Sequence, residues 1–391
     1  MAAPQQKPNN RALRVLHIAF TMHARGTETW LMNLLRRIDP KKVSMDFVTI
    51  EDEVGVYDEE IKRLGGTLHA CPHPKNKGAF LRRFREVLDQ HGPYDVVHAH
   101  PYTMAGPIML QSMRAGVPVR ITHSHTDRRK ARRDKSFIRR IYGWFMRKLI
   151  DRLSTYGLAA SQQAAEDLFG QYWQEDKRWN VMYCGVDLRP FENRPSTNFK
   201  KELGIPAKSK VIGHVGSFHF EKNHDFILRL FSHMAKKDMT LILLLVGDGP
   251  LKEKIADQVI AMGLENRVIM TGVREDISNL LSVMDIFLFP SLFEGLGLSL
   301  IEAQAAGIRC LVSDVVPREA SVNDDLVTFL PLDEEAQTWA SAVKIILDQK
   351  PVNAQKALDI IKKSQFNIDH NAIMLTELYQ TLCSQKKQVF S

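Results

Sequence analysis

The sequence predicts an α/β protein made of two Rossmann-like, doubly wound domains that face each other across a cleft. Its 391 residues exceed what one hydrophobic core usually serves. Short aliphatic and β-branched runs alternate with amphipathic stretches, a pattern typical of βαβ units around a parallel sheet. This pattern restarts after a polar, proline-containing linker at residues 189–210. In such folds ligands bind beyond the carboxyl ends of the strands, where we expect the active site.

The first domain is expected at residues 13–195, after a tail at 1–12 that we expect to be disordered. Aliphatic runs predict its strands at residues 14–20, 45–50, 94–100, 117–125, 155–161 and 181–187. Amphipathic stretches predict helices near residues 28–38 and 105–115. Together these segments complete one doubly wound unit.

The second domain is expected at residues 196–365. Its strands are predicted at residues 210–218, 239–249, 267–273, 285–291, 309–315 and 327–330. Its helices are predicted at residues 223–235, 250–262, 276–283, 299–306, 334–349 and 353–384. The end of the chain, residues 366–391, is expected to be helical and to pack back on the first domain.

Composition and cysteine spacing narrow the class of protein. Hydrophobic residues make up 44% and charged residues 25% of the chain, as in soluble globular proteins. The start is polar, unlike a signal peptide, and the apolar run at residues 241–246 is too short to span a bilayer, so we expect a cytoplasmic protein. The four cysteines are scattered without a C-x-x-C pair, so neither disulfides nor a metal site are expected.

Positive charge is concentrated at residues 128–148, where ten Lys and Arg accompany one acid, within a net charge of +8. Apolar residues at near-helical spacing lie among them, which indicates a basic amphipathic helix that could rest on anionic lipid. The residues expected at the membrane are Arg139, Arg140, Trp144, Arg147 and Lys148. A solvated helix face would look the same. Nucleic acid is not an expected partner, because no recognition motif accompanies the charge.

The segment PSLFEGLGLSLIEAQAAG, residues 290–307, carries Glu294 and Glu302 in a strand, glycine-rich turn and helix context. Gly295 and Gly297 let the backbone approach a ligand, and the new helix offers unpaired N–H groups to a diphosphate. This indicates an anion site. Two alternatives remain open: Glu302 could close an S-x-x-E capping box with Ser299, and Glu294 could be an exposed loop acid.

This segment resembles the glutamate-pair signature of the family 4 retaining glycosyltransferases, which have the GT-B fold, and especially of the enzymes of exopolysaccharide and capsule synthesis. The resemblance extends over nearly the whole chain. Further matching stretches are GTETWLMNLLRRID (26–39), YDVVHAH (94–100), VRITHSHTD (119–127), AASQQAAEDLFG (159–170), GHVGSFHFEKNHDF (213–226) and LLVGDGP (244–250). The order of these stretches makes the resemblance specific.

The resemblance implies transfer of a sugar from a nucleotide-diphosphate sugar, expected to be a UDP-sugar, to a glycan or lipid-linked acceptor, without a metal or other cofactor. Glu294 would contact the donor sugar, Glu302 the ribose diol, and Lys222 would clamp the diphosphate. The remaining donor-binding positions would be Gly26, Ser217, Val273, Arg274, Gly295, Leu296, Gly297 and Leu298.

Two strands carry histidine pairs at their carboxyl ends. His123 and His125 are two residues apart and therefore share one face of their strand. By resemblance, His125 would reach the donor sugar and act in catalysis with Glu294 and Lys222. His98 and His100 repeat the arrangement on the preceding strand, and we expect these two and His123 to line the acceptor side.

The chain departs from the family pattern at two positions. Ser217 replaces an arginine that usually follows the glycine, and a missing cation at the diphosphate could cost several kcal/mol of transition-state stabilisation. His219 or Arg25 would have to compensate. Arg25 in turn replaces one glycine of the usual Gly-Gly-x-Glu loop, whereas Gly26 and Glu28 are kept.

Three other classes of protein remain to be separated. A nucleotide-sugar 2-epimerase shares the fold but needs acid and base carboxylates near the sugar, and it would react with the donor alone. A non-catalytic assembly subunit is indicated by Ser217 and the basic helix, and it would fail to bind nucleotide sugars. A dehydrogenase is disfavoured, because no G-x-G-x-x-G follows the first strand.

Overall fold

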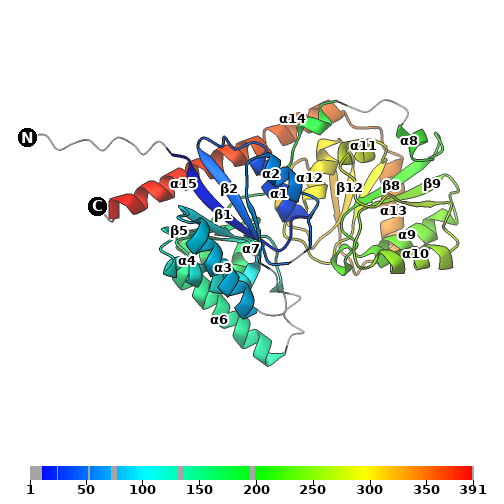
Figure 1. Cartoon of the computed structure of the whole chain (residues 1–391). Helices are drawn as coiled ribbons and strands as arrows, with labels where there is room; N and C mark the ends of the chain where they lie inside the picture. The colour runs from blue at the N-terminus through cyan, green and yellow to red at the C-terminus, as the bar shows by residue number, and fades with distance from the viewer. Residues whose placement is uncertain are drawn as a thin grey trace, which may run out of the picture. The chain divides into compact units, whose positions relative to one another are not determined.

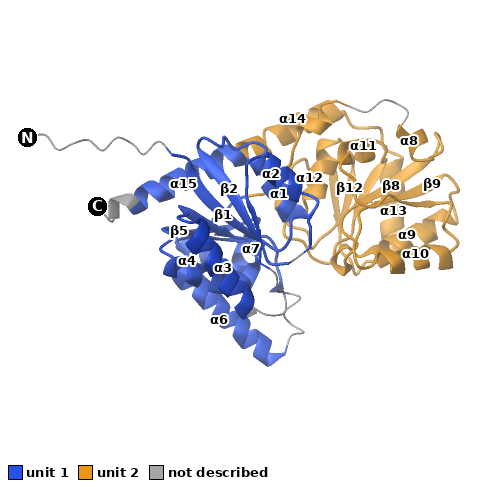
Figure 2. Ribbon diagram, in the orientation of Figure 1, with its two compact units in different colours: residues 1–182, 371–391 blue, residues 183–370 orange. Residues whose placement is uncertain are grey.

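The computed structural model describes residues 11–23, 25–51, 53–71, 77–129, 136–193 and 199–389. The chain forms two compact units, one of residues 1–182 with 371–391 and one of residues 183–370 (Figure 2). Residues 1–10 of the tail that was expected to be disordered lie outside the described residues. Arg11, within the same tail, is held by two hydrogen bonds of 2.8 and 2.9 Å to Asp95.

Unit 1 contains a seven-stranded parallel sheet in the order β3-β2-β1-β4-β5-β6-β7 (Figure 1). Its strands are β1 (Leu13–Ala19), β2 (Val43–Thr49), β3 (Leu68–Ala70), β4 (Val96–Ala99), β5 (Val119–Ser124), β6 (Tyr156–Ala159) and β7 (Trp179–Val181). The strand order reverses beside β1, so the switch point of the sheet lies between β1 and β4, where ligands of this class of sheet bind.

Helices cover the sheet of unit 1. They are α1 (Gly26–Leu35), α2 (Asp58–Arg63), α3 (Lys77–His91), α4 (Ala105–Arg114), α6 (Phe137–Leu153), α7 (Gln162–Phe169) and α15 (Ile368–Val389), with short 3-10 turns η1 (Tyr102–Met104) and η2 (Trp173–Glu175). The fully buried side chains of Leu16, Ile18, Phe80 and Val97 lie in one core cluster. The strand residues Leu16, Ile18 and Val97 are aliphatic because both faces of a parallel sheet are covered.

Unit 2 contains a six-stranded parallel sheet in the order β10-β9-β8-β11-β12-β13. Its strands are β8 (Lys210–Val215), β9 (Leu241–Val246), β10 (Val268–Met270), β11 (Ile286–Phe289), β12 (Cys310–Ser313) and β13 (Val327–Leu330). Its switch point lies between β8 and β11, and the loops that follow these two strands therefore meet at one edge of the sheet.

The helices of unit 2 pack on this sheet around a core that includes Trp339, Phe231 and Ile227. They are α8 (Phe199–Glu202), α9 (His224–Ala235), α10 (Lys252–Ala261), α11 (Ile277–Ser282), α12 (Leu298–Ala305), α13 (Ala336–Leu347) and α14 (Ala354–Lys362), with 3-10 turns η3 (Arg189–Phe191), η4 (Phe220–Lys222) and η5 (Arg318–Ala320). The Trp339 indole N–H donates to the Pro331 carbonyl at 3.0 Å, so the buried ring keeps its one polar group hydrogen-bonded.

The boundary between the units falls after Met182, whereas linker composition had placed it after residue 195. Val186 and Asn367 form an isolated parallel bridge, and the Val186 N–H donates to the Phe366 carbonyl at 2.8 Å. These backbone bonds attach the segment after Met182 to unit 2. Residues 194–198 of the expected linker lie outside the described residues.

The single helix predicted over residues 353–384 is wrong, because it is broken between α14 and α15. The Asn367 side-chain amide donates to the Lys362 carbonyl at 3.0 Å, and its oxygen accepts the Asp369 N–H at 3.0 Å. Asn367 thus ends one helix and begins the next, while Phe366 between them is fully buried. The elements α2, β3 and α3 were not predicted; β3 has only three residues and α3 is rich in charge.

All four cysteines are buried and none forms a disulfide with another. Among the helices in the described residues, none combines the length and the apolar content needed to cross a bilayer.

Candidate functional site

Lys222 and Glu294 meet at the carboxyl edge of the sheet in unit 2. Lys222 ends η4, in the loop after β8, and Glu294 lies in the loop after the neighbouring strand β11. The Lys222 Nζ donates to Glu294 Oε1 at 2.5 Å, and the Ser291 Oγ donates to the same oxygen at 2.8 Å. The two charged side chains are only 16% and 10% exposed. A cation and a carboxylate are therefore held together, mostly out of water, where the sequence expected diphosphate and sugar to bind.

The position of Lys222 depends on its neighbours. Asn223, which follows it, has a left-handed backbone (φ 59°) and its side-chain amide donates to the Pro290 carbonyl at 3.1 Å. The Lys222 Nζ lies 5.0 Å from the centroid of the Phe289 ring. A Cβ on Gly216 would come within 3.3 Å of the Lys222 side chain. Gly216 is therefore the residue that leaves room for the lysine stem.

Helix α12 begins directly after the glycine-rich turn. Gly297 precedes it with φ 92°, and no side chain caps the helix. Ser299 lies inside the helix, so the S-x-x-E capping box that the sequence left open is not formed. The half-buried Glu302 receives no hydrogen bond from any described residue, and burial raises its pKa to about 7. Gly295 and Leu296 are buried, and Leu298 is half-buried.

The remaining donor-site candidates of unit 2 lie beyond β8 and β10. Ser217 follows β8 and is half-buried. Val273 is exposed, as a residue that contacts a base must be. The Arg274 guanidinium donates two hydrogen bonds of 2.7 Å to the Asp276 carboxylate, so its charge is already paired within the loop. Contact of Val273 and Arg274 with a nucleobase stays a prediction.

In unit 1, His98 and His123 are fully buried and bonded to each other. The distance from His98 Nε2 to His123 Nδ1 is 3.2 Å, and that from His98 Nδ1 to the Tyr379 hydroxyl is 2.7 Å. Because neither ring has exposed surface, neither can contact an acceptor in this conformation. The acceptor-side roles expected for them therefore do not fit their burial, since Tyr379 of α15 covers His98 and Trp30 of α1 lies against His123.

His100 joins two further histidines. Its Nδ1 lies 2.8 Å from His125 Nε2, and its Nε2 lies 3.1 Å from His17 Nδ1. The sequence analysis missed His17, although it stands near the carboxyl end of β1, next to His98 on β4. His125 is partly exposed, whereas His100 and His17 are buried, so His125 is the member of this row that a ligand can reach.

We refer to His17, His98, His100, His123 and His125 as the histidine cluster. Burial lowers the pKa of His17 and of His125 to about 3, so both rings are neutral at physiological pH. The ring nitrogens of two overlapping triads, His17 with His98 and His100, and His100 with His123 and His125, lie within 4.8 Å of one another, close enough to share a metal ion. In the structure most of these nitrogens are already hydrogen-bonded to each other.

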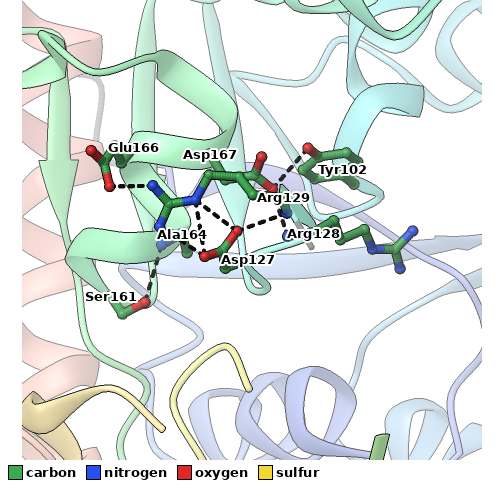
Figure 3. Close-up of polar contacts among 8 residues, drawn as sticks. All are labelled: Tyr102, Asp127, Arg128, Arg129, Ser161, Ala164, Glu166 and Asp167. Atoms are coloured by element: carbon green, nitrogen blue, oxygen red, sulfur yellow. Dashed lines mark hydrogen bonds and ion pairs between the residues drawn. The ribbon is translucent and has the colours of Figure 1, made fainter. Parts of the chain in front are cut away.

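The loop after β5 is tied to α7 by charged side chains (Figure 3). Arg129 donates to both oxygens of Asp127, at 2.8 to 3.0 Å, and to Glu166. Asp167 accepts the Arg128 backbone N–H and the Tyr102 hydroxyl, both at 2.8 Å. The sequence analysis did not single out these residues as a site, although the run Thr-Asp-Arg-Arg directly after His125 was visible.

The amino end of α1 carries the Arg25-Gly26-Thr27-Glu28 stretch. Gly26 is the first residue of the helix, and both it and Arg25 are exposed, as an approach to phosphate requires. Glu28 is 5% exposed, and burial raises its pKa to about 7. Glu28 is thus a buried carboxyl group in the first helical turn, which the sequence analysis did not place in the site.

Helix α6 presents two unlike faces. Met146, Ile150 and Leu153 are buried against unit 1. The exposed apolar side chains are Phe137, Ile138, Ile141, Trp144 and Phe145, between 52% and 78% exposed. The predicted basic amphipathic helix is therefore present over residues 137–153, while residues 130–135 of the basic segment lie outside the described residues.

Comparison with known proteins finds a family model that matches each half of the chain. A family model described as "Glycosyltransferase Family 4" matches residues 24–189, and one described as "Glycosyl transferases group 1" matches residues 195–365. The solved structure of Anabaena HepE with UDP and glucose superposes with a TM-score of 0.77 at 17% identity, covering 94% of this chain and 100% of that one. A likeness at this identity shows the fold, which is GT-B.

Curated relatives match over most of their length. The putative glycosyltransferase EpsF of Bacillus subtilis is 37% identical, covering 86% of this chain and 88% of the relative. The capsular polysaccharide biosynthesis glycosyltransferase CapH of Staphylococcus aureus is 26% identical over 94% of this chain and 99% of its own. Two family models, one for each half of the chain, and a relative of this identity lead to one conclusion: the chain belongs to the family 4, group 1 glycosyltransferases and is a transferase of glycosyl groups.

Proposed function

We propose that this enzyme transfers a sugar from a UDP-sugar, with retention of configuration, to a polysaccharide or lipid-linked acceptor in exopolysaccharide or capsule biosynthesis. The curated relatives support this proposal through their names, which include EpsF, CapH and an Escherichia coli galactosyltransferase that uses UDP-Gal and a GlcNAc-diphosphoundecaprenol acceptor. Solved structures of the same fold hold UDP and UDP-glucose.

The observation that carries the proposal is the Lys222–Glu294 pair, supported by Ser291. A departing diphosphate gains negative charge in the transition state, and a preorganised cation stabilises that charge. Lys222 would supply this cation: its Nζ is bonded to Glu294, whose carboxylate also accepts the Ser291 hydroxyl. On donor binding, the diphosphate would take over part of the lysine charge, and the Glu294 carboxylate would accept hydrogen bonds from the sugar hydroxyls.

Helix α12 would complete the donor site. Its first-turn N–H groups, after the left-handed Gly297, add positive potential for the diphosphate. The Glu302 carboxyl, which no described group bonds, would bind the ribose diol. The Ser217 hydroxyl would offer the diphosphate a hydrogen bond but no charge, so Lys222 and α12 would supply the positive field, and the proposal requires no bound metal.

His125 would contribute from unit 1. As the partly exposed member of the histidine cluster, it would contact the donor sugar as a neutral hydrogen-bonding group, while His100 orients its ring. Gly26 at the amino end of α1 would approach the donor phosphates. The proposal includes no protein nucleophile. The diphosphate would leave, and the acceptor would attack, on the same face of the sugar.

We also propose that α6 rests on an anionic membrane surface, as a peripheral contact on the cytoplasmic side. Its exposed Trp144 and Phe145 would enter the lipid boundary, while Arg139, Arg140, Arg147 and Lys148 would meet anionic headgroups. A pocket of about 190 Å³ beside α6 is lined in part by Trp144, Arg147 and Lys148, and one buried guanidinium nitrogen of Arg147 lacks a partner among the described residues.

A thermal-shift panel of nucleotide diphosphates and nucleotide sugars tests the donor site, because a ligand that binds only the folded state raises its melting temperature. We expect one nucleotide, UDP in the first instance, to stabilise the wild type but not Glu302→Ala. Glu265→Ala, which removes an exposed carboxylate of the same unit, is the matched control and should respond as the wild type does. No stabilisation by any nucleotide would refute the proposal and favour a non-catalytic assembly role.

A further inference from the structure

Arg128 and Arg129 are adjacent in the loop after β5 but have opposite environments. The charge of Arg129 is fully paired, because the carboxylates of Asp127 and Glu166 both bind the Arg129 guanidinium and raise the pKa of that group. The Arg128 side chain is exposed, and no described carboxylate pairs with it. Figure 3 shows the Arg128 guanidinium turned away from the Asp127–Arg129–Glu166 group. Among the described residues of this loop, Arg128 therefore presents an uncompensated cation to its surroundings.

Both the backbone and the side chain of Arg128 have a contact that positions them. Its backbone N–H donates to Asp167 Oδ2 at 2.8 Å. Its guanidinium carbon lies 5.3 Å from the centroid of the Tyr102 ring, which is within the range of a cation–π contact. The Tyr102 hydroxyl donates to the same Asp167 oxygen at 2.8 Å. One buried carboxylate thus sets the positions of the arginine backbone and of the ring that supports its side chain.

Tyr102 has a strained backbone in this arrangement. Its φ is 30°, which bulky residues rarely adopt. The hydrogen bond to Asp167, a residue only 3% exposed, helps to keep the ring under the guanidinium. Such strain persists only where the surrounding structure over-determines it, and a freely solvated arginine would not need a support of this kind.

The place of Arg128 in the fold bears on the kind of ligand that it could bind. It lies three residues after His125 and at the carboxyl edge of the sheet, where ligands of doubly wound sheets bind. The 3-10 turn η1, which contains Tyr102, packs against α6, whose exposed apolar residues suit a lipid chain. The proposed sugar contact of His125, the exposed Arg128 and the exposed apolar face of α6 belong to the same unit, as binding of the sugar, the diphosphate and the chain of a lipid-linked sugar would require.

We infer that Arg128, supported by Tyr102 and Asp167, binds the diphosphate that joins sugar and lipid in the acceptor. This inference rests on the proposed transferase function and names the acceptor class. Arginine binds phosphate oxygens in a bidentate fork, and its side chain is strongest in this role when preorganised. The donor diphosphate has its own cation, Lys222, in unit 2, so the two anionic groups of the reaction have separate partners.

The experiment measures binding by titration calorimetry, with saturating UDP present to occupy the donor site. The first probe is N-acetylglucosamine joined through diphosphate to a geranyl chain, and the second is the neutral geranyl glycoside of the same sugar. We expect the wild type to prefer the diphosphate probe, and Arg128→Gln to weaken that probe roughly 10- to 100-fold. The neutral probe should bind both proteins equally.

Three variants make the outcome specific. Arg114→Gln removes an equally exposed charge from α4 and should leave both probes unaffected. Arg128→Lys keeps the charge without the fork and should bind with intermediate affinity. Tyr102→Phe keeps the ring but loses the bond to Asp167, and it should weaken the diphosphate probe less than Arg128→Gln does.

Each opposing outcome overturns the inference. Equal binding of the two probes by the wild type, or an unchanged affinity of Arg128→Gln, would remove the acceptor role. Loss of UDP stabilisation in Arg128→Gln would assign the residue to the donor instead. Loss of binding to vesicles of phosphatidylglycerol, with the soluble probe unaffected, would assign it to lipid headgroups. If the wild type itself is not stabilised by UDP, the proposed function fails first, which distinguishes the two.

Discussion

At the scale of single residues, the donor site that we propose in unit 2 is built on an ion pair that is mostly out of water. Moving a cation and a carboxylate from water into the protein costs free energy of solvation. The attraction between the two charges offsets this cost only while both partners are present. Lys222 and Glu294 meet this condition with Ser291 as a third member. A pair of this kind is a weak source of stability but a ready binding site, because an entering anion can compete for the lysine.

The Lys222–Glu294 pair can be tested by a double-mutant cycle. Lys222→Ala leaves Glu294 uncompensated, and we expect it to lower the free energy of unfolding by about 2 kcal/mol and to abolish UDP stabilisation. Lys222→Ala combined with Glu294→Ala should regain most of the stability and none of the UDP response. Melting curves with and without UDP measure both effects. If the effects of Lys222→Ala and Glu294→Ala, each measured alone, add up to the effect of the double variant, the pair is not coupled.

At the scale of elements, the turn into α12 is a central part of the proposed donor site. Gly297 has φ 92°, and a Cβ there would lie 3.0 Å from the Phe289 ring. Both the backbone conformation and the space therefore require glycine. This explains why a glycine stands directly before α12, the helix whose amino end we propose as part of the donor site.

Gly297→Ala should therefore destabilise the protein through strain and contact together, by about 1 to 3 kcal/mol, and should weaken UDP binding. Gly263→Ala is the matched control, because Gly263 also has a positive φ (66°) but open space around its Cβ position. We expect the control to show a smaller loss of stability and a normal UDP response in thermal melts. A Gly297→Ala variant that binds UDP normally would contradict the role given to this turn.

Helix α6 exposes a row of large apolar side chains that no described residue covers. Replacement of Arg139, Arg140, Arg147 and Lys148 by glutamine should weaken sedimentation with phosphatidylglycerol vesicles at least tenfold, since each charge near an anionic surface contributes about 1 kcal/mol. The effect should shrink as salt rises. Binding to neutral phosphatidylcholine vesicles serves as the control. Unchanged binding to the anionic vesicles would refute the membrane contact.

At the scale of the whole molecule, two parallel sheets are each covered on both faces, and this burial extends to histidines. The histidine cluster lies within unit 1, and His214 and His224 are buried in unit 2. Burial lowers the pKa of His17 to about 3 and of His224 to about 4, so the native state holds them neutral while the unfolded chain protonates them below about pH 6.5. Their contribution to stability is present above that pH and is lost as the pH falls.

Stability should accordingly fall on acidification. For each histidine that stays neutral in the native state, a change from pH 7.5 to 5.5 should cost about 1.4 kcal/mol. His17→Phe should reduce this pH dependence by one such increment, whereas His370→Phe, at an exposed position, should leave it unchanged. Urea unfolding at both pH values measures the difference. A wild type equally stable at both would contradict the neutral, buried state of the cluster.

The local pattern of the sequence determined the fold class and most strands and helices, because a buried parallel strand needs a continuous aliphatic run and a covering helix needs one apolar face. The resemblance to the family singled out Lys222 and Glu294, since the motifs that carry it are short and contiguous. The break at Asn367 was not visible, because it depends on pairing with Val186, a segment distant in the chain.

Side-chain partners across strands were decided only by the tertiary structure. Whether a histidine at the end of a strand faces a ligand or the core depends on what lies beyond it. For His98 that neighbour is Tyr379, 281 residues further along the chain. The contrast between Arg128 and Arg129 has the same origin, because two adjacent arginines look alike in sequence until α7 brings Glu166 and Asp167 beside them. Sequence periodicity reports burial along one element, whereas charge pairing and orientation depend on elements that only folding brings together.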